Sequence, residues 1–269
     1  MTLTMGIVNV TPDSFSDGGR YLDADAAIAH GLALRAAGAD LLDVGGESTR
    51  PGAARVDPAT ERARVLPVVA ALAADGAVVS IDTMNAATAR AAVDAGARIV
   101  NDVSGGLADA DMLPVVAASG ADVVLQHWRG HSADMYADAD YGDVARDLTI
   151  ELGDRVRVAA AAGISPDRVI LDPGIGFGKR GPQNWQALRG LDRIVALGPR
   201  VLVGTSRKRF LAETLDADPA GVSVARRDLA TAVTSVLAAQ TGAWAVRVHD
   251  VAATRDALRI ARAWREGGE

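Results

Sequence analysis

The chain has 269 residues, of which 49% are hydrophobic, a size that suits one large α/β barrel or two smaller domains. It contains no cysteine, which excludes disulfides, thiolate nucleophiles and Cys-ligated zinc. A net charge of -6 argues against a general nucleic-acid-binding surface. No apolar run reaches the roughly 20 residues that span a bilayer, and no basic segment leads into a long apolar one, so we expect a soluble, cytoplasmic protein without a membrane partner.

Short β-branched runs alternate with alanine-rich helical segments along the whole chain, without a linker long enough to divide it. Strands are predicted at Met5–Val10, Leu41–Gly45, Val78–Asp82, Ile99–Asp102, Val123–His127, Val169–Asp172, Val201–Gly204 and Ala245–Val248. Helices are predicted at Ala24–Ala37, Pro58–Ala74, Ala86–Ala95, Ala110–Ala118, Tyr141–Ala162, Pro182–Ala196, Lys208–Thr214, Arg227–Gln240 and Ala252–Trp264. This pattern predicts an α/β fold, a single-domain TIM (β/α)8 barrel over residues 1–269. The alternative, a doubly wound sheet, normally has a glycine fingerprint in its first βα turn that is missing here.

Polar residues stand where almost every predicted strand ends. They are Asn9, Glu47, Asp82, Asn101, Asp102, Gln126, His127, Asp172, Ser206, Lys208, Arg247 and His249. A single Asp or Asn in such a place most often caps the next helix. In a TIM barrel, however, the carboxyl ends of all strands meet on one face, where the βα loops form the active site. The set therefore predicts one shared pocket.

The charges of these residues indicate the kind of ligand. Asp82, Asn101 and Asp172 offer the hydrogen-bonding groups that a flat heterocycle with N–H groups requires. The predicted cations are Arg50, Arg207, Lys208, Arg209, Arg247 and His249. The basic stretch SRKRF could be a solvated helix start, but cations there oppose the helix dipole, so a bound anion explains them better. We expect a ligand with a polar ring at one end and phosphate at the other.

Seven segments carry these residues: MGIVNVTPDSFSDGG, DVGGESTRPGA, SIDT, NDVSGG, ILDPGIGFGK, GTSRKRF and VRVHD. Together, and in this order, they resemble the motifs of dihydropteroate synthases, most closely the actinobacterial forms. The resemblance covers nearly the whole chain. It implies condensation of 6-hydroxymethyl-7,8-dihydropterin pyrophosphate with p-aminobenzoate to give 7,8-dihydropteroate and pyrophosphate, in the folate pathway. Such a substrate has the polar ring and the diphosphate that the charges indicate.

The resemblance also implies a role for each matching residue. The expected pterin-binding residues are Asp82, Asn101, Val103, Gln126, Asp172, Phe177 and Lys208. The expected diphosphate-binding residues are Asn9, Thr49, Arg247 and His249, and Asn9 is also the expected ligand of a Mg²⁺ cofactor. The expected p-aminobenzoate-binding residues are Phe15, Arg50, Pro51, Lys208 and Arg209. The expected catalytic residues are Asp17, Phe15 and Lys208.

The resemblance further implies a dissociative mechanism, in which pyrophosphate leaves first and a methylene cation is trapped by the arylamine. A hard cation that keeps most of its waters and bridges diphosphate oxygens needs only one or two protein oxygens, so a single Asn suffices. The loops Thr11–Gly19 and Glu47–Gly52 resemble lids over the substrates, and the intact second loop implies competition by sulfonamides. A homodimer is expected, and a covalent enzyme intermediate is not.

Two departures and two alternatives accompany the resemblance. Gln126 stands where the family usually has Met beside the pterin ring, so its amide requires partners, and the acidic segment Trp128–Asp140 has no assigned role. Methyltetrahydrofolate-binding methyltransferases share the Asp and Asn pterin edge but need no diphosphate site. A catalytically silent pterin-binding paralogue is the other alternative, against which the intact lid motifs argue. Without the resemblance, the residues define only a phosphate-binding barrel enzyme.

Overall fold

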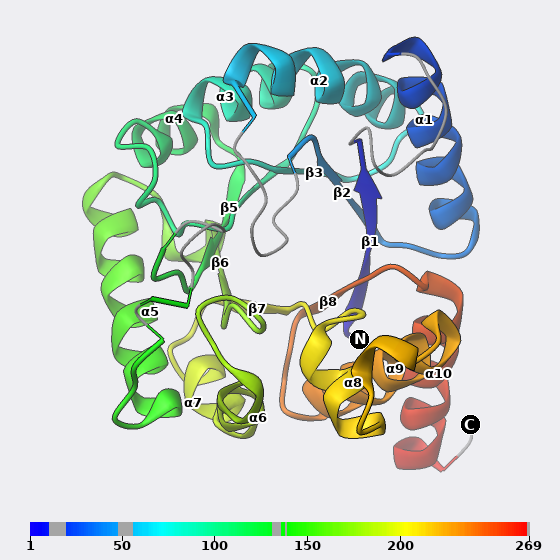
Figure 1. Cartoon of the computed structure of the whole chain (residues 1–269). Coiled ribbons are helices and arrows are strands. Elements are labelled where there is room, and N and C mark those ends of the chain that lie inside the picture. Colours follow the sequence, from blue (N-terminus) through cyan, green and yellow to red (C-terminus); the bar gives the residue numbers. More distant parts are fainter. Residues whose placement is uncertain (11–19, 48–55, 131–135, 138, 268–269) are drawn as a thin grey trace.

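The computed structural model describes the chain except for residues 11–19, 48–55, 131–135, 138 and 268–269. Eight parallel strands form a closed barrel in sequence order, with the last strand paired to the first (Figure 1). The strands are β1 Leu3–Asn9, β2 Leu41–Gly45, β3 Val79–Asp82, β4 Ile99–Asp102, β5 Asp122–Gln126, β6 Val169–Asp172, β7 Arg200–Val203 and β8 Ala245–Val248. The predicted TIM barrel is confirmed.

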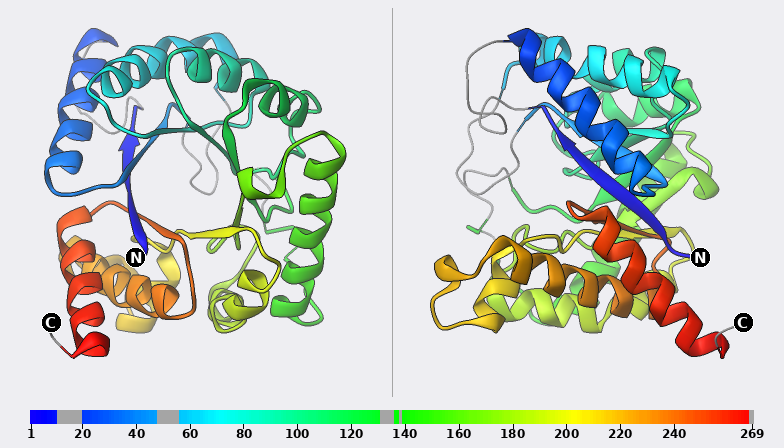
Figure 2. Two further views of the ribbon diagram at one scale, coloured as in Figure 1. Left: turned by 180° about the vertical axis from the view of Figure 1, so that it is seen from behind. Right: turned by 90° about the vertical axis from the view of Figure 1, so that its right-hand side faces the viewer.

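Helices surround the barrel, as both views in Figure 2 show. The α-helices are α1 Arg20–Ala36, α2 Pro58–Ala74, α3 Ala86–Asp94, α4 Met112–Ser119, α5 Val144–Ala161, α6 Gly181–Arg189, α7 Leu191–Val195, α8 Arg209–Leu215, α9 Val224–Gln240 and α10 Val251–Glu266. Two 3₁₀ helices are η2 Pro166–Arg168 and η3 Pro219–Gly221. Within the described part of the chain, none of these helices is both long and apolar enough to cross a membrane.

The alternation of side chains along the strands places the polar residues above the barrel core. Seven buried residues pack together as a core cluster: Met5, Leu41, Ile99, Val124, Ile170, Leu202 and Ala245. Because side chains two positions apart point to the same face of a strand, the residue two positions further along also points inward. At five of these strands that residue is polar: Asp43, Asn101, Gln126, Asp172 and Arg247. The barrel therefore directs these five polar side chains into one space at the carboxyl ends of the strands.

Local caps and contacts explain where the observed helices differ from the predicted ones. The prediction of one continuous helix over Pro182–Ala196 is wrong, because the segment forms two helices, α6 and α7, that are separated at Gly190. A Cβ at this position would lie 2.3 Å from Cβ of Ala145, so α5 packs directly against the break. The predicted helix Tyr141–Ala162 begins only at Val144, since the Asp143 side chain caps it by accepting from the Arg146 N–H at 3.1 Å.

Candidate active site

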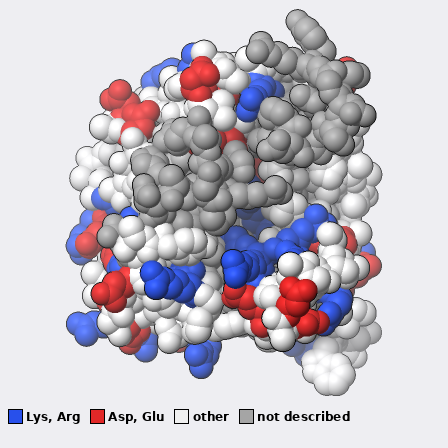
Figure 3. Space-filling view, in the orientation of Figure 1, with Lys and Arg blue, Asp and Glu red and all other residues white. Residues whose placement is uncertain are grey.

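A pocket of about 1240 Å³ opens at the carboxyl ends of the strands. It is lined by these predicted residues: Asn9, Asp82, Asn101, Val103, Gln126, Asp172, Phe177, Lys208, Arg209, Arg247 and His249. The structure thus brings together every described residue that the sequence predicted for the pterin, the diphosphate and p-aminobenzoate. Lys and Arg side chains gather near the centre of this face of the molecule (Figure 3). The other predicted site residues, Phe15, Asp17, Thr49, Arg50 and Pro51, lie outside the described residues.

Arg247, which lines the pocket, joins two buried carboxylates. Its Nε donates to Asp43 at 2.6 Å and its Nη2 donates to Asp82 at 2.9 Å. Asn101 donates from Nδ2 to the same Asp43 oxygen at 3.0 Å. Asp43, which is fully buried, was not among the predicted site residues. The signal in the sequence was a charged residue within the strand LLDVG, because strands of a parallel barrel are buried on both faces.

The two predicted pterin carboxylates are both buried, and their surroundings differ. Burial raises the pKa of Asp82, Arg247 opposes this rise, and the Asp43 carboxylate adds to it. Burial also raises the pKa of Asp172, while the Lys208 ammonium and the N–H of Gly174 oppose the rise. The Gly174 N–H donates to Asp172 Oδ1 at 2.7 Å, which fixes the orientation of that carboxylate.

Lys208 lies between the acidic edge and the aromatic wall of the pocket. Its Nζ donates to the Ile175 carbonyl and lies 4.7 Å from the centroid of the Phe177 ring. Burial lowers the pKa of Lys208 to about 8, with Asp172 opposing the fall and Arg247 adding to it. A cation in this place can neutralise an acidic neighbour and hold an aromatic wall at the same time.

His249 is held at the end of β8 by a hydroxyl from the β7 end. Ser206 Oγ lies 2.8 Å from His249 Nδ1 and accepts from the His249 backbone N–H at 3.1 Å. This pair of contacts orients the imidazole directly after β8, on which Arg247 stands two residues earlier. Arg247 and His249, both predicted to bind the diphosphate, therefore approach the pocket from one strand end.

Gln126 has the partner that its amide requires. The side chain is 5% exposed, and its Nε2 donates to the Val103 carbonyl at 3.3 Å. The residue that departs from the family pattern thus bonds to a carbonyl that follows the neighbouring strand β4.

Two arginines of the SRKRF stretch make ion pairs with helices. Arg207 donates from Nε and Nη2 to the carboxylate of Asp228 on α9, at 2.7 and 2.9 Å. Arg209 donates from Nε to Glu213 at 2.8 Å, and its side chain is 84% exposed. Both residues line the pocket, and each shares its charge with one of these carboxylates.

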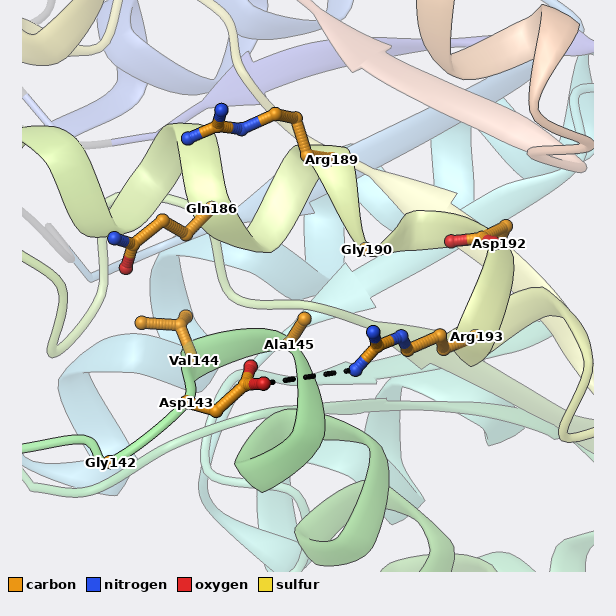
Figure 4. A pocket seen from close by; sticks show the side chains of 9 residues that line it. All are labelled: Gly142, Asp143, Val144, Ala145, Gln186, Arg189, Gly190, Asp192 and Arg193. Atoms are coloured by element: carbon orange, nitrogen blue, oxygen red, sulfur yellow. Dashed lines mark ion pairs between the residues drawn. The ribbon is translucent and has the colours of Figure 1, made fainter.

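A second hollow, of about 480 Å³, lies outside the barrel where the start of α5 meets α6 and α7 (Figure 4). Arg193 and Asp143 face one another across it at 4.0 Å. None of the predicted site residues lines it, and it lies in the helix layer rather than at the strand ends, so the strand-end pocket is the candidate active site.

The fold and the pocket define a TIM-barrel enzyme whose site combines a buried acidic edge with cations. The profile of a family described as "Pterin binding enzyme" matches residues 5–249. The dihydropteroate synthase of Mycobacterium leprae is 54% identical over 98% of this chain and 94% of that protein. The chain therefore belongs to the pterin binding enzymes and, among them, to the dihydropteroate synthases.

Solved structures agree with this assignment. The Xanthomonas albilineans dihydropteroate synthase with 4-aminobenzoic acid matches with a TM-score of 0.90 and 45% identity, over 98% of this chain and 93% of that one. The same bacterium's enzyme in complex with 7,8-dihydropteroate matches with a TM-score of 0.87 and 42% identity, over 98% and 94% of the two chains. The family resemblance read from the sequence is confirmed.

Proposed function

We propose that this protein condenses 6-hydroxymethyl-7,8-dihydropterin pyrophosphate with p-aminobenzoate, giving 7,8-dihydropteroate and pyrophosphate. One observation carries the proposal. Arg247, at the cationic end of the pocket, bonds directly to Asp43 and Asp82 at its acidic end, so one pocket contains both ends. A methyltetrahydrofolate-binding barrel would need the acidic edge alone. The solved relatives that hold 4-aminobenzoic acid and 7,8-dihydropteroate support the same reaction for this chain.

The acidic edge would bind the pterin ring. Asp172, whose carboxylate is oriented by Gly174, would accept from the amino and ring N–H groups of the pterin, and Asp82 and Asn101 would complete the edge. Phe177 and Val103 would form walls of the ring pocket, and Lys208 would lie near the ring carbonyl. Since the carboxylates are buried, their charge is poorly screened and can stabilise a developing cation.

The chemical step is proposed to be dissociative. The bond between the methylene carbon and the diphosphate oxygen breaks, and its electron pair leaves with pyrophosphate. The arylamine nitrogen then bonds to the methylene cation and loses a proton. Arg247 and His249 would stabilise the negative charge of the leaving diphosphate. The carboxylates of Asp82 and Asp172 would stabilise the positive charge of the methylene cation. The roles proposed for Asp17, Phe15, Thr49, Arg50 and Pro51 rest on the family resemblance.

Asn9, the last residue of β1, fits the role of a ligand for a Mg²⁺ ion bound together with the diphosphate. Asn9 is half-buried, lines the pocket and offers one neutral amide oxygen. Among the described residues, no group of three or more His, Asp or Glu side chains could hold a metal ion. Mg²⁺ keeps several waters and often binds few protein oxygens, so Asn9 would suffice together with the diphosphate. When bound, the ion would neutralise charge on the leaving group.

A pyrophosphate-release assay with and without p-aminobenzoate tests the proposed function. We expect release that depends on p-aminobenzoate and forms 7,8-dihydropteroate, with sulfonamides competing against p-aminobenzoate. Binding of the pterin diphosphate without release would favour a silent paralogue. Calorimetry with pyrophosphate, with and without Mg²⁺, tests the metal, and Asn9→Ala should remove the Mg²⁺ dependence. Asp172→Ala should abolish binding of the pterin diphosphate.

The outer faces of α9 and α10 support the predicted homodimer. Leu229, Val233 and Leu237 stand four residues apart on α9 and are 66%, 52% and 54% exposed. Helix α10 lies beside α9 (Figure 1). On it, Ile260 and Trp264 are 71% and 88% exposed. Side chains four apart share one helix face, so α9 presents an apolar stripe that a second copy of this chain could cover.

Light scattering tests the homodimer. Leu229→Glu should give a monomer, whereas Leu107→Glu, a change at a residue that is 53% exposed between β4 and α4, should not. A monomeric wild-type protein would reject the dimer. The cytoplasmic location predicted from the sequence is part of the same proposal, and cell fractionation tests it.

A further inference from the structure

The β6–α6 loop, residues 173–180, carries Phe177 and directly follows Asp172. Side-chain donors, both from the loop itself and from other parts of the chain, bind the carbonyl groups of this loop. Lys179 Nζ donates to the carbonyls of Gly174 and Phe177, each at 3.0 Å. The Tyr141 hydroxyl donates to the Gly178 carbonyl at 2.8 Å. The loop contains one backbone turn bond, from the Phe177 N–H to the Gly174 carbonyl at 3.0 Å, and no helix or strand, so these side-chain donors add to a single backbone bond in fixing its shape.

Lys179 is 1% exposed, a rare environment for a lysine. Its third contact is with Nδ1 of His127, at 3.1 Å. An ammonium group has three protons, and the Gly174 carbonyl, the Phe177 carbonyl and His127 Nδ1 are three acceptors. Every donor of the buried ammonium therefore has a partner, and two of these partners are in the loop. Burial lowers the pKa of Lys179 to about 7, with Asp172 opposing the fall, so the ammonium is the main form below pH 7.

His127 is held in the state that accepts this contact. Its Nε2 lies 2.8 Å from Glu151 Oε2, so the neutral ring donates there and keeps Nδ1 free of a proton for Lys179. Burial and the charge of Lys179 lower the pKa of His127 to about 4, which favours the neutral ring. Glu151 also accepts from Arg129 Nε at 3.3 Å, and the Arg129 guanidinium lies 3.9 Å from the centroid of the Tyr141 ring. Two residues that follow β5 thus hold the loop: His127 provides an acceptor for Lys179, and Tyr141 provides a donor for the Gly178 carbonyl.

One residue, Gly174, connects Lys179 to the site through its two backbone groups. The Gly174 carbonyl accepts from Lys179, and the Gly174 N–H donates to the carboxylate of Asp172 at 2.7 Å. Gly174 also lies against the end of β5, because a Cβ at this position would be 2.3 Å from the His127 carbonyl. A shift of the loop would therefore move both the N–H that orients Asp172 and the backbone that carries Phe177.

We propose that Lys179 is a positioning residue for pterin binding, which fixes the β6–α6 loop against His127 and thereby orients Asp172 and Phe177. The proposal rests on the proposed function, because it assigns Lys179 to the pterin end of that site. A residue that served stability alone would lower the melting temperature of the protein without changing its affinity for a pterin.

Arg168 provides the matched control. It donates from Nε to the Ala121 carbonyl at 3.0 Å and from Nη2 to the Val116 carbonyl at 2.7 Å. It stands just before β6, whereas Lys179 stands after it, so it bonds to carbonyls at the opposite end of the barrel. Arg168→Met and Lys179→Met remove the same kind of contact, and only the second lies near the pocket.

The test combines calorimetry with 7,8-dihydropteroate and steady-state kinetics. Lys179→Met should weaken dihydropteroate binding and raise the KM for the pterin diphosphate by about tenfold or more, the loss typical of a hydrogen bond to a charged group. The kcat at saturating substrate should fall by less than the KM rises. Arg168→Met should lower the melting temperature and leave both constants unchanged. Normal dihydropteroate affinity in Lys179→Met, or equal losses in both variants, would overturn the proposal.

Tyr141→Phe keeps the proposal testable if Lys179→Met fails to fold. It removes only the hydroxyl that donates to Gly178, without burying an unpaired charge. It should raise the dissociation constant for dihydropteroate by about two- to tenfold, the range of one neutral hydrogen bond, and unchanged affinity would contradict the proposed role of the loop. Product binding does not require turnover. A wild-type protein that binds dihydropteroate without synthesising it would reject the proposed function and leave the role of Lys179 open to this test.

Discussion

Arg247 and Asp82 form an ion pair, with 2.9 Å between Nη2 and a carboxylate oxygen. A residue expected at the diphosphate is thereby bonded to a residue expected at the pterin ring. The same guanidinium binds Asp43, so one cation balances two buried carboxylates. Binding at either end of the substrate should therefore change the electrostatics at the other end.

Replacing Arg247 tests this coupling. Arg247→Leu should destabilise the fold by about 3 to 5 kcal/mol, because it leaves the fully buried Asp43 without its charge partner. It should also abolish pyrophosphate binding. Urea denaturation and calorimetry measure the two effects. Arg200→Leu, which breaks an ion pair with Asp122 at the opposite end of the barrel, is the control and should leave pyrophosphate binding intact. Normal pyrophosphate binding by Arg247→Leu would reject the assignment of this residue.

Gly174 tests how strictly the loop after β6 must lie against β5. Its φ is +63°, and an added Cβ would be 2.3 Å from the His127 carbonyl. Gly120 has a φ of +75° with nothing within 4 Å of an added Cβ. Gly120→Ala should therefore show only the cost of the left-handed backbone, about 1 to 2 kcal/mol.

Gly174→Ala has the same backbone cost and adds the clash with His127. We expect a larger loss of unfolding free energy than in Gly120→Ala, and weaker binding of dihydropteroate in Gly174→Ala alone. Denaturant unfolding and calorimetry check both points. Equal stabilities of the two variants would show that the loop can move away from β5 at little cost.

The lowered pKa of Lys208 predicts that pterin binding weakens at alkaline pH. Burial lowers its pKa to about 8, so its ammonium loses its charge as the pH rises through that value. Above it, Asp172 and Asp82 would lack this neighbouring cation, and kcat/KM for the pterin diphosphate should fall. Lys208→Arg keeps the charge at these pH values and should remove the alkaline fall, even if the maximal rate is lower. A fall that persists in Lys208→Arg would assign the limit to another group.

The barrel and most of the pocket were predictable because both follow from local patterns. Runs of apolar residues gave the strands, and the polar residue at the end of each strand gave the lining, since the fold alone directs those ends to one face. Asp82, Asn101 and Asp172 needed only this rule. The side chains of Lys208 and His249 also lie where the rule put them.

The contacts between these residues were not predictable, because they join distant segments. Arg247 and Asp43 are 204 positions apart, and no periodicity indicates that they meet. The position of Lys179 in the motif ILDPGIGFGK gave no sign that it is buried, since lysines are rarely buried and its acceptors come partly from His127. The break at Gly190 likewise depends on the close approach of α5, which the sequence of the predicted helix does not contain.

His127 and Glu151 predict how the folded protein responds to acid. Burial and the charge of Lys179 lower the pKa of His127 from 6.5 to about 4. Between these values His127 binds a proton in the unfolded chain but not in the folded chain, so its contribution to the free energy of unfolding should fall as the pH falls from 6.5 to 4, by up to about 1.4 kcal/mol per pH unit. Asp82, whose pKa burial raises to about 7, contributes in the opposite direction, so the contribution of His127 is measured as the difference between the wild type and a His127 variant. Burial would raise the pKa of Glu151, but its hydrogen bonds with His127 and Arg129 bring it from 4.5 to about 2.

The stability that Glu151 contributes is therefore present above pH 4.5 and is lost as the pH falls toward 2. Urea unfolding at pH 7, 5.5 and 4.5 separates the contribution of His127 from that of Glu151. Of these two residues, only His127 changes its protonation over most of that range in the unfolded chain. His127→Gln should be less stable than the wild type at pH 7 and should lose less stability on acidification. The same change at His30, which is exposed on α1, should leave the slope as it is in the wild type. If His127→Gln kept the wild-type slope, the acid sensitivity would have to come from groups outside the His127–Glu151 pair.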